Sequence, residues 1–267
     1  MSLSIQGRTA IVTGAARGVG RAIAAHFVDR GANVMMADCD EAALDQAIGD
    51  FPETAPVRAF AGRIYEKLAM ANLLSATLDA FDRVDILVNA HRLVRNSDPL
   101  DTDMDSLSDM LGQNMMCGLR LSQLVAKRMI KQAEAEVDPL QIGAIVNIST
   151  LAGRRPVPAM LGYSIACAAQ EQATRGLALA LAPLRIRVNG VSFSSVMSHE
   201  LKLALKDDPD LRDRIVEGTP LGRIASPDEL TETVHYLVSE ASRFVTGQII
   251  SVDGGRSLAD PVTAQVQ

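Results

Sequence analysis

A glycine-rich segment near the amino terminus constrains the fold of this chain more than any other feature. The segment spans residues 13–20 and carries Gly14, Gly18 and Gly20 in the spacing Gly-x-x-x-Gly-x-Gly, between an apolar strand-like run and an amphipathic helical run. Glycines allow a tight turn and a close approach of backbone to an anion, and the N-terminus of the next helix presents unpaired N–H groups. The segment therefore predicts a phosphate-binding turn in an α/β unit.

A carboxylate stands at the end of the next apolar run. Asp38 follows the apolar residues 33–37, where dinucleotide-binding folds place an acidic residue that binds the ribose hydroxyls. Because a carboxylate there repels the extra phosphate of NADP, NAD is the expected cofactor. The alternative is that Asp38 caps a helix, since Glu41 lies three residues later.

Apolar strand-like runs alternate with helical runs along the whole chain. Such alternation predicts an α/β fold with a mostly parallel sheet and helices on both faces. One helix start is marked by Ser226, Pro227 and Glu229, which have the pattern of a capping box with proline in the first turn. The seven expected strands are residues 9–13, 33–38, 56–61, 85–89, 143–149, 185–191 and 248–252.

Length and composition predict one soluble domain. Of the 267 residues, 48% are hydrophobic and 22% are charged, and the net charge of −6 disfavours a nucleic-acid surface. The longest apolar run, Leu177–Leu184, is too short to cross a membrane, and residues 1–6 lack a targeting pattern, so a cytoplasmic location is expected. We expect a single domain over residues 1–267 with a helical substrate lid at about 192–219.

The cysteines give no sign of a cross-link or a metal site. Cys39, Cys117 and Cys167 are isolated in the sequence, with neither a CxxC pair nor a cysteine–histidine cluster, and the four histidines are scattered. The sequence therefore predicts neither a disulfide nor a metal site.

Several further motifs follow the glycine segment in a fixed order. They are Thr13-Gly14-x-x-x-Gly18-x-Gly20, Asp38, Asp85–Asn89, Asn114, Ile145–Thr150 with Gly153, Tyr163, Ile186–Asn189, Thr246-Gly247 and Asp253–Gly255. With these residues the chain resembles the short-chain dehydrogenase/reductase family over about residues 7–255. The resemblance implies a Rossmann-like doubly wound sheet of seven strands, a nicotinamide dinucleotide at its carboxyl edge, and hydride exchange with a small alcohol or carbonyl substrate.

The same resemblance assigns catalytic positions. Tyr163 matches the family's general acid/base, and Asn114 matches the residue that supports a water relay. Thr150 occupies the position of the serine that polarises the substrate oxygen, so a hydroxyl is kept on a β-branched carbon. The structural alternatives are a tyrosine at a helix start, a threonine that ends a strand and an amide at a helix start.

The lysine position of the family, four residues after the tyrosine, holds Cys167. A free tyrosine has a pKa near 10, so without a neighbouring cation only about one molecule in a thousand is phenolate at pH 7. Alcohol oxidation, which needs this base, is expected to suffer more than carbonyl reduction, which needs the protonated form. Cys167 itself is interpreted as a buried apolar filler rather than a nucleophile.

The residues expected to contact the cofactor, by resemblance, are Gly14, Arg17, Gly18, Val19, Gly20, Asp38 and Asn89. Three departures from the family pattern surround them. The turn after the fourth strand is Asn89-Ala90-His91-Arg92 instead of Asn-Asn-Ala-Gly, the acidic residue after the third strand is Gly62, and Phe193-Ser194 replaces Pro-Gly. Together these changes weaken the case for the usual binding mode.

Two functions are compatible with these residues. The first is an NAD(H)-dependent oxidoreductase with an unusual tetrad, and the second is a catalytically impaired relative that serves as a ligand-binding or oligomeric scaffold. By resemblance, a homodimer or homotetramer would assemble through the helices that contain Asn114 and Tyr163, where Ala166, Ala169 and Ala173 would allow close packing.

Overall fold

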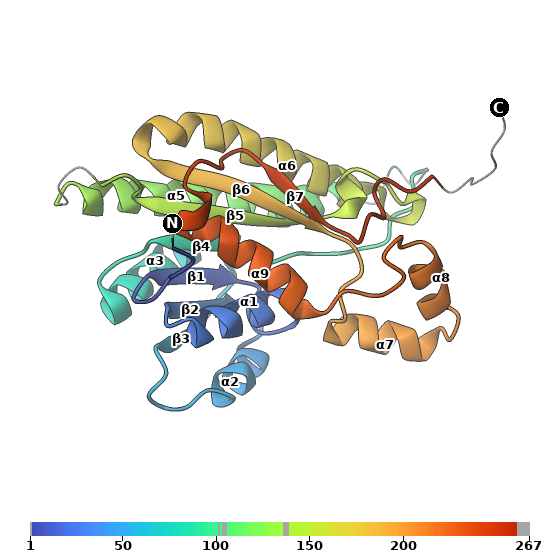
Figure 1. Ribbon diagram of the computed structural model, residues 1–267, viewed down its shortest axis with the longest axis horizontal. Coiled ribbons are helices and arrows are strands. Elements are labelled where there is room, and N and C mark those ends of the chain that lie inside the picture. Colours follow the sequence, from blue (N-terminus) through green and yellow to red (C-terminus); the bar gives the residue numbers. More distant parts are fainter. Residues whose placement is uncertain (1, 101, 103–105, 136–138, 261–267) are drawn as a thin grey trace.

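The computed structural model describes residues 2–100, 102, 106–135 and 139–260, and contains a seven-stranded parallel sheet in the order β3-β2-β1-β4-β5-β6-β7 (Figure 1). The predicted α/β, doubly wound fold is confirmed. The strands are β1 (Thr9–Thr13), β2 (Asn33–Asp38), β3 (Val57–Ala61), β4 (Ile86–Asn89), β5 (Gly143–Thr150), β6 (Ile186–Phe193) and β7 (Ile249–Val252).

Helices cover both faces of the sheet. Helices α1, α2 and α9 pack in one hydrophobic cluster, and α3, α5 and α6 pack in a second cluster on the other face. The α-helices are α1 (Gly18–Asp29), α2 (Glu41–Gly49), α3 (Lys67–Phe81), α4 (Ser106–Met110), α5 (Cys117–Ala133), α6 (Leu161–Leu181), α7 (His199–Asp207), α8 (Leu211–Glu217) and α9 (Pro227–Val238). Within the described ranges, none of the helices has the length and apolar character needed to cross a membrane.

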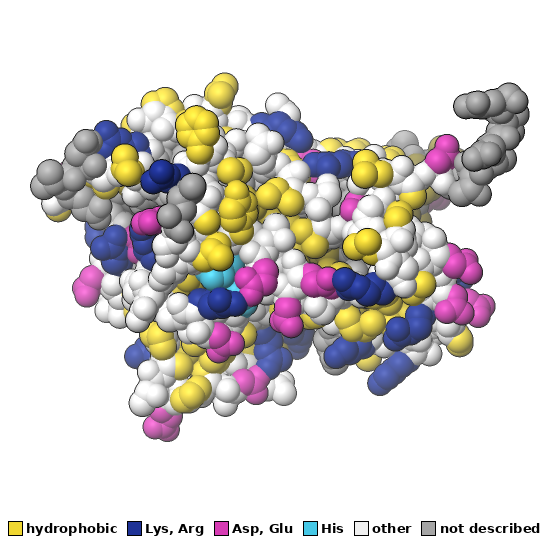
Figure 2. All heavy atoms as spheres, in the orientation of Figure 1, with side chains coloured by type: hydrophobic (Ala, Val, Ile, Leu, Met, Phe, Trp, Pro, Cys, Tyr) yellow, Lys and Arg dark blue, Asp and Glu magenta, His cyan; other side chains and the backbone are white. Residues whose placement is uncertain are grey.

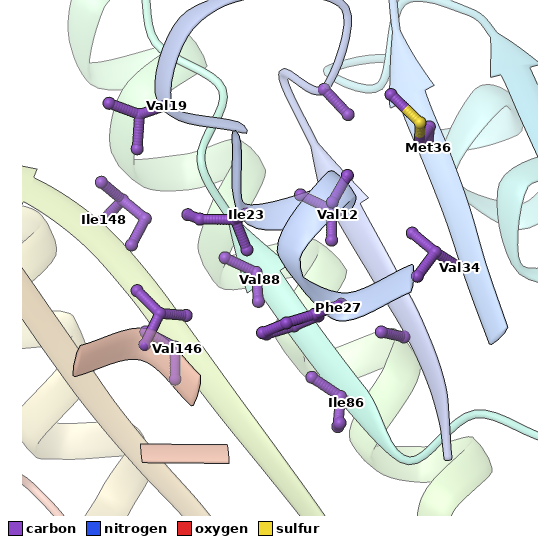
Figure 3. Close-up of a cluster of buried hydrophobic side chains, with 14 of the residues drawn as sticks. Val12, Val19, Ile23, Phe27, Val34, Met36, Ile86, Val88, Val146 and Ile148 are labelled. Carbon is purple, nitrogen blue, oxygen red and sulfur yellow. The ribbon is translucent and has the colours of Figure 1, made fainter. Parts of the chain in front are cut away.

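The core under α1 shows why the strands have continuous apolar runs. Phe27 is fully buried at the centre of a cluster whose other members include Val12, Val88 and Val146 from neighbouring strands (Figure 3). Parallel strands that are covered on both faces expose no side to water, so both sets of alternating side chains are apolar. This burial fixes α1, and with it the turn that precedes the helix.

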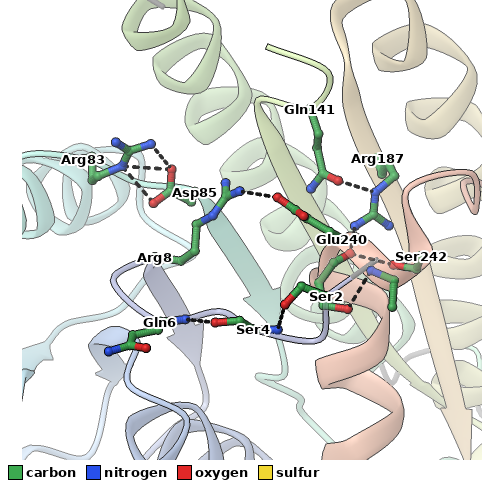
Figure 4. A network of polar contacts seen from close by, with 12 residues as sticks. Ser2, Ser4, Gln6, Arg8, Arg83, Asp85, Gln141, Arg187, Glu240 and Ser242 are labelled. Atoms are coloured by element: carbon green, nitrogen blue, oxygen red, sulfur yellow. Dashed lines mark hydrogen bonds and ion pairs between the residues drawn. The ribbon is translucent and has the colours of Figure 1, made fainter.

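The amino ends of the strands are tied together by polar contacts (Figure 4). The Asp85 carboxylate accepts a hydrogen bond from the Thr9 backbone N–H at 2.9 Å, and the Arg187 guanidinium donates to the Leu237 carbonyl at 2.8 Å. The first residues also join this edge, because the Ala241 N–H donates to the Ser2 carbonyl at 3.1 Å. The N-terminal segment is therefore held against the end of α9.

Of two helix caps considered from the sequence, one is present in the structure and one is not. The capping box of α9 is present, with the Ser226 N–H bonded to the Glu229 carboxylate at 2.9 Å. The alternative that Asp38 caps a helix is wrong, because α2 begins at Glu41 and Asp40 accepts the cap bond from the Ala43 N–H.

One surface prediction also fails. Ala166 is fully buried in a small cluster with Met110 and Tyr163, because it lies three residues after Tyr163 on the same face of α6. Ala166 cannot form part of a subunit interface, whereas Ala169 and Ala173 are half-buried in the single chain.

Candidate active site

The strand order reverses between β1 and β4, and the predicted site residues gather beyond the carboxyl ends of the strands. Asp38, Asn89 and Thr150 are the last residues of β2, β4 and β5, and Phe193 ends β6. In doubly wound sheets, ligands bind at this switch point because the loops on its two sides diverge.

The glycine segment forms a cradle between β1 and α1. Gly14 and Gly18 have φ angles of +64° and +56°, in the left-handed region that favours glycine. A Cβ on Gly20 would lie 2.1 Å from the Gly14 carbonyl oxygen, so only glycine lets α1 start this close to the turn. Arg17 precedes α1 and makes no side-chain cap bond, which leaves the first N–H groups of α1 available to an anion.

Asp38 holds the cradle to the end of β2. Its two carboxylate oxygens accept from the backbone N–H groups of Ala16 and Asp40, each at 3.1 Å. A carboxylate has about four acceptor positions, so Asp38 can still accept from a ribose hydroxyl. Arg17 points to Asp40, with which it pairs at 2.7 Å.

His91 lies in the turn that departs from the family pattern, and its role was not predicted from the sequence. Its Nε2–H donates to the Gln113 carbonyl at 2.9 Å, so its Nδ1 accepts the Thr13 hydroxyl hydrogen at 2.7 Å. Burial lowers the pKa of His91 to about 4, which keeps the imidazole neutral at pH 7. His91 therefore fastens the loop after β4 across the cradle rather than acting as an acid.

A small cavity of about 130 Å³ remains beside Gly14 and Asp38. Cys39, Arg63 and His91 also line it. This volume is well below the roughly 300 Å³ that pockets for drug-sized ligands start from. The large side chain of His91 narrows the space in which an adenosine group would be expected.

Tyr163 lies in the first turn of α6, close to Thr150 and Cys167. It is only 4% exposed, and the Cys167 sulfur lies 3.5 Å from the Thr150 hydroxyl oxygen. Burial, with a further contribution from Cys167, raises the pKa of Tyr163 to about 12, although Arg92 and a hydrogen bond with Thr150 act in the opposite direction. The phenol is therefore protonated at neutral pH and is suited to donate a proton.

Arg92 lies in the same turn, and its proximity to Tyr163 was not predicted from the sequence. Its guanidinium lies 5.4 Å from the centroid of the Phe193 ring, and its charge acts on Tyr163. Arg92 thus places a cation beside Tyr163, in the turn where the family pattern has glycine. The sequence offered one signal for this contact: an arginine stands where the family pattern has glycine.

Asn114 lies in a π-helical turn, Leu111–Met116, between α4 and α5. Its Oδ1 accepts from the Leu93 N–H at 2.6 Å and its Nδ2 donates to the Leu93 carbonyl at 2.8 Å. The amide therefore ties the loop after β4 to this turn, and it is not an ordinary helix-start amide. Single π-helical turns are frequent at functional sites.

Two other residues that were predicted to contact the cofactor, Asn89 and Val19, have side chains buried in the protein. The Asn89 side chain is fully buried and its Nδ2 donates to the Asn147 Oδ1 at 2.8 Å, below the sheet edge. Val19 is buried in the first turn of α1. A contact of either residue with a cofactor would use main-chain atoms.

A larger cavity of about 780 Å³ opens beside Tyr163 and Thr150. Leu201 and Ala204 of α7, in the segment predicted to be a lid, form one wall. Arg92, Arg155 and Arg256 also line the cavity, and no aspartate or glutamate is among its described lining residues. The cavity is therefore positive, although the whole chain carries a net charge of −6.

Comparison with known proteins decides which group this chain belongs to. The family model described as enoyl-(acyl carrier protein) reductase matches residues 14–257. The protein named dehydrogenase/reductase SDR family member 4 from Caenorhabditis elegans is 30% identical over 258 residues, which cover 94% of this chain and 95% of that protein. The chain belongs to the short-chain dehydrogenase/reductase (SDR) family.

Other SDR proteins resemble the chain over nearly its whole length. A 7alpha-hydroxysteroid dehydrogenase from Escherichia coli strain K12 is 29% identical over 256 residues, which cover 95% of this chain and 96% of that protein. The crystal structure of a candidate gluconate dehydrogenase from Agrobacterium tumefaciens superposes with a TM-score of 0.87 at 27% identity and covers 97% of this chain and 99% of that chain. SDR proteins typically use a nicotinamide cofactor, and these relatives support a dehydrogenase or reductase activity.

Proposed function

We propose that this SDR protein is an NAD(H)-dependent oxidoreductase that exchanges hydride with a small alcohol or carbonyl substrate, with carbonyl reduction as the favoured direction. One observation carries the proposal: Tyr163 and Thr150 line the same large cavity, at the edge of the sheet that also carries the glycine cradle. A protonated phenol and a second hydroxyl beside an open cavity are the groups that a carbonyl oxygen needs during reduction.

The residues of the cradle fit a dinucleotide at its phosphates. Gly14, Gly18 and the uncapped start of α1 would hold the phosphates, and Asp38 would hold the adenosine ribose. When bound, the nicotinamide ring supplies or accepts the hydride. Because Asp38 would repel a ribose phosphate, NAD is expected rather than NADP.

The chemistry left to this chain is the handling of the substrate oxygen. Thr150 donates a hydrogen bond to the carbonyl oxygen, and Tyr163 delivers the proton as negative charge develops there. The pKa of Tyr163, about 12, keeps the proton on the phenol at neutral pH. The reverse reaction requires the phenolate, of which only about one molecule in 100,000 is present at pH 7.

The charge of the cavity supports a substrate with an acidic group. Arg155 and Arg256 reach the cavity from the loop after β5 and from the segment after β7. Arg155 donates to the Ala259 carbonyl and Arg256 donates to the Ser195 hydroxyl at 3.1 Å, so the hydrogen-bond partners shown for both guanidinium groups are uncharged. Guanidinium groups bind carboxylates and phosphates through paired hydrogen bonds. We therefore expect an oxo acid or another anionic carbonyl compound to be preferred over a neutral one.

Only one observation favours the second function, a ligand-binding or oligomeric scaffold. It is the small size of the space beside His91. The cavity of about 130 Å³ beside Gly14 leaves little room for an adenosine group. A scaffold would bind no dinucleotide and would retain its assembly when Tyr163 is replaced.

The test is loss of NADH absorbance with a panel of oxo acids, each paired with its methyl ester. We expect turnover with members of the acid series and a loss of about 100-fold or more in Tyr163→Phe, with NADH binding unchanged. Equal rates for Tyr163→Phe and wild type would refute the role of the tyrosine. Absence of both turnover and NADH binding in the folded protein would support the scaffold.

A further inference from the structure

Three metal-ligating side chains meet where α9 crosses α1, on the face of the sheet that α1 and α9 cover. His26 lies on α1, and Glu232 and His235 lie one turn apart on α9. His26 and His235 are 209 residues apart, so their meeting could not be read from the sequence, which predicted no metal site. Figure 2 shows histidine atoms at the surface beside acidic side chains on this side of the molecule.

The three candidate ligand atoms form a compact triangle. His26 Nε2 lies 3.1 Å from His235 Nδ1, and Glu232 Oε2 lies 3.9 Å and 3.7 Å from these two nitrogens. In a tetrahedral zinc site with metal–ligand distances of about 2.0–2.2 Å, ligand atoms lie roughly 3.3–3.6 Å apart. The observed edges lie within a few tenths of an ångström of this range, and Glu232, at 52% side-chain exposure, can rotate to close the gap.

The surroundings fix the donor atoms as they are fixed in known metal centres. The Nε2–H of His235 donates to the Leu3 carbonyl at 2.6 Å, which leaves the Nδ1 lone pair directed at His26. Ligating histidines commonly donate their other N–H to a carbonyl or carboxylate in this way. Leu3 is itself held in place, because the neighbouring Ser2 carbonyl accepts from the Ala241 N–H.

The carboxylate is also oriented. Arg30 donates to Glu232 Oε1 at 2.6 Å, which leaves Oε2 as the oxygen nearer the two histidines. His235 is 3% exposed at its side chain and His26 is 13% exposed, so the pair is shielded while Glu232 opens to water. A water molecule could complete a four-coordinate site from the open side.

The His26 imidazole has to change tautomer to bind a metal ion. Because His235 Nε2–H donates to the Leu3 carbonyl, His235 Nδ1 accepts the Nε2–H of His26 at 3.1 Å when no metal is present. Binding requires the His26 hydrogen to move from Nε2 to Nδ1, a tautomer change with no net loss of a proton.

We propose that His26, Glu232 and His235 form a binding site for a divalent transition-metal ion of the zinc type, which links α1 to α9. Two histidines and one glutamate are a known donor set for Zn²⁺. The site is separate from the proposed catalytic cavity and does not depend on the proposed function. Because the ligands come together only in the folded chain, the ion stabilises the fold and raises Tm.

The experiment is a calorimetric titration of metal-free, full-length protein with Zn²⁺, with Co²⁺ absorption as a report of coordination. The test variants are His26→Gln and Glu232→Gln. His235 is left unchanged because it also bonds to Leu3, and Glu232→Gln keeps the size of a side chain that is 52% exposed. The matched control is Cys39→Ser, since Cys39 is an exposed thiol between two aspartates and is the natural competitor for zinc.

We expect one Zn²⁺ per chain, a rise in Tm on binding, and a loss of affinity of about tenfold or more in both test variants but not in the control. The Co²⁺ bands typical of four-coordinate sites should weaken in the same two variants. No binding to the wild type, unchanged binding in Glu232→Gln, or loss of binding in Cys39→Ser alone would each overturn the proposal.

Discussion

Replacing Cys167 by lysine should move the ionisation of Tyr163 into an accessible pH range. Cys167 is 3% exposed and its sulfur lies 3.5 Å from the Thr150 hydroxyl, in the cluster that also contains Tyr163. A cation about 4–6 Å from an ionisable group lowers its pKa by roughly 1–3. From a starting pKa of about 12, the phenol of Cys167→Lys should therefore ionise between about pH 9 and 11.

The chain is well suited to a direct measurement of this shift. It contains no tryptophan and three tyrosines, so the increase in ultraviolet absorbance at high pH reports tyrosine ionisation almost alone. The difference in this absorbance change between Cys167→Lys and Cys167→Lys/Tyr163→Phe isolates the ionisation of Tyr163. The same difference for wild type and Tyr163→Phe should show no ionisation of Tyr163 below about pH 11.

The expected effect on alcohol oxidation follows from the same pKa values. A fall of 1–3 in the pKa raises the phenolate fraction at pH 9 by about ten- to several-hundred-fold, and alcohol oxidation should increase in proportion. Cys167→Met adds length without charge and controls for the overpacking that a longer side chain causes, which costs about 1–3 kcal/mol. If folded Cys167→Lys and Cys167→Met show the same Tyr163 ionisation and the same oxidation rate, the reasoning about the missing cation is refuted.

Four further outcomes are expected. Oxidation by the wild type should rise about tenfold per pH unit from pH 7 to 10 while reduction stays flat, because the phenol is the acid form below a pKa of about 12; a plateau near pH 8 would contradict this. Gly20→Ala should abolish NADH binding, since its Cβ would collide with the Gly14 carbonyl, and undiminished binding in a calorimetric titration would be the contrary result. Phe27→Ala should lower the free energy of unfolding by about 3–5 kcal/mol in urea titrations, and a loss below 1 kcal/mol would contradict the packing described. Arg155→Gln with Arg256→Gln should raise KM for an oxo acid by roughly ten- to hundredfold and leave KM for its methyl ester unchanged; equal effects on both would argue against an anionic substrate.

The sheet was predictable because its strands are buried on both faces. Runs such as Ile86–Asn89 and Gly143–Thr150 carry the signal within a few consecutive residues. The strand ends were less certain, since β6 continues to Phe193, which pairs with Thr150 and Val252 rather than obeying a local pattern. Element ends of this kind are set by the neighbouring strands.

Residues of the site were predictable only where a motif fixes both their identity and their place. Gly14 follows β1, Asp38 ends β2 and Tyr163 lies in the first turn of α6, and the sheet determines where each of these elements lies. Arg92 could not be placed beside Tyr163, because that contact depends on how the loop after β4 crosses the cradle, and His91 holds this loop through Thr13 and Gln113. Contacts between α1 and α9 were equally unpredictable from the sequence, because they depend on how the two helices cross in the folded chain.

The family's usual mode of assembly stays a prediction. SDR proteins are often oligomeric, and α6 exposes Leu161, Ile165 and Leu179 on this single chain. With Ala166 excluded, an interface on α6 would have to use exposed residues of this kind. Light scattering of wild type and of Ile165→Asp would test it, with dissociation of the variant expected.

The account depends most on whether the glycine cradle binds a nicotinamide dinucleotide despite His91 and Arg92. A calorimetric titration of the purified protein with NADH, and with NADPH as the control for Asp38, addresses this directly. We predict one NADH bound per chain with micromolar affinity and much weaker binding of NADPH. Folded protein that binds neither nucleotide would contradict the assignment as an oxidoreductase and leave the scaffold as the function of this chain.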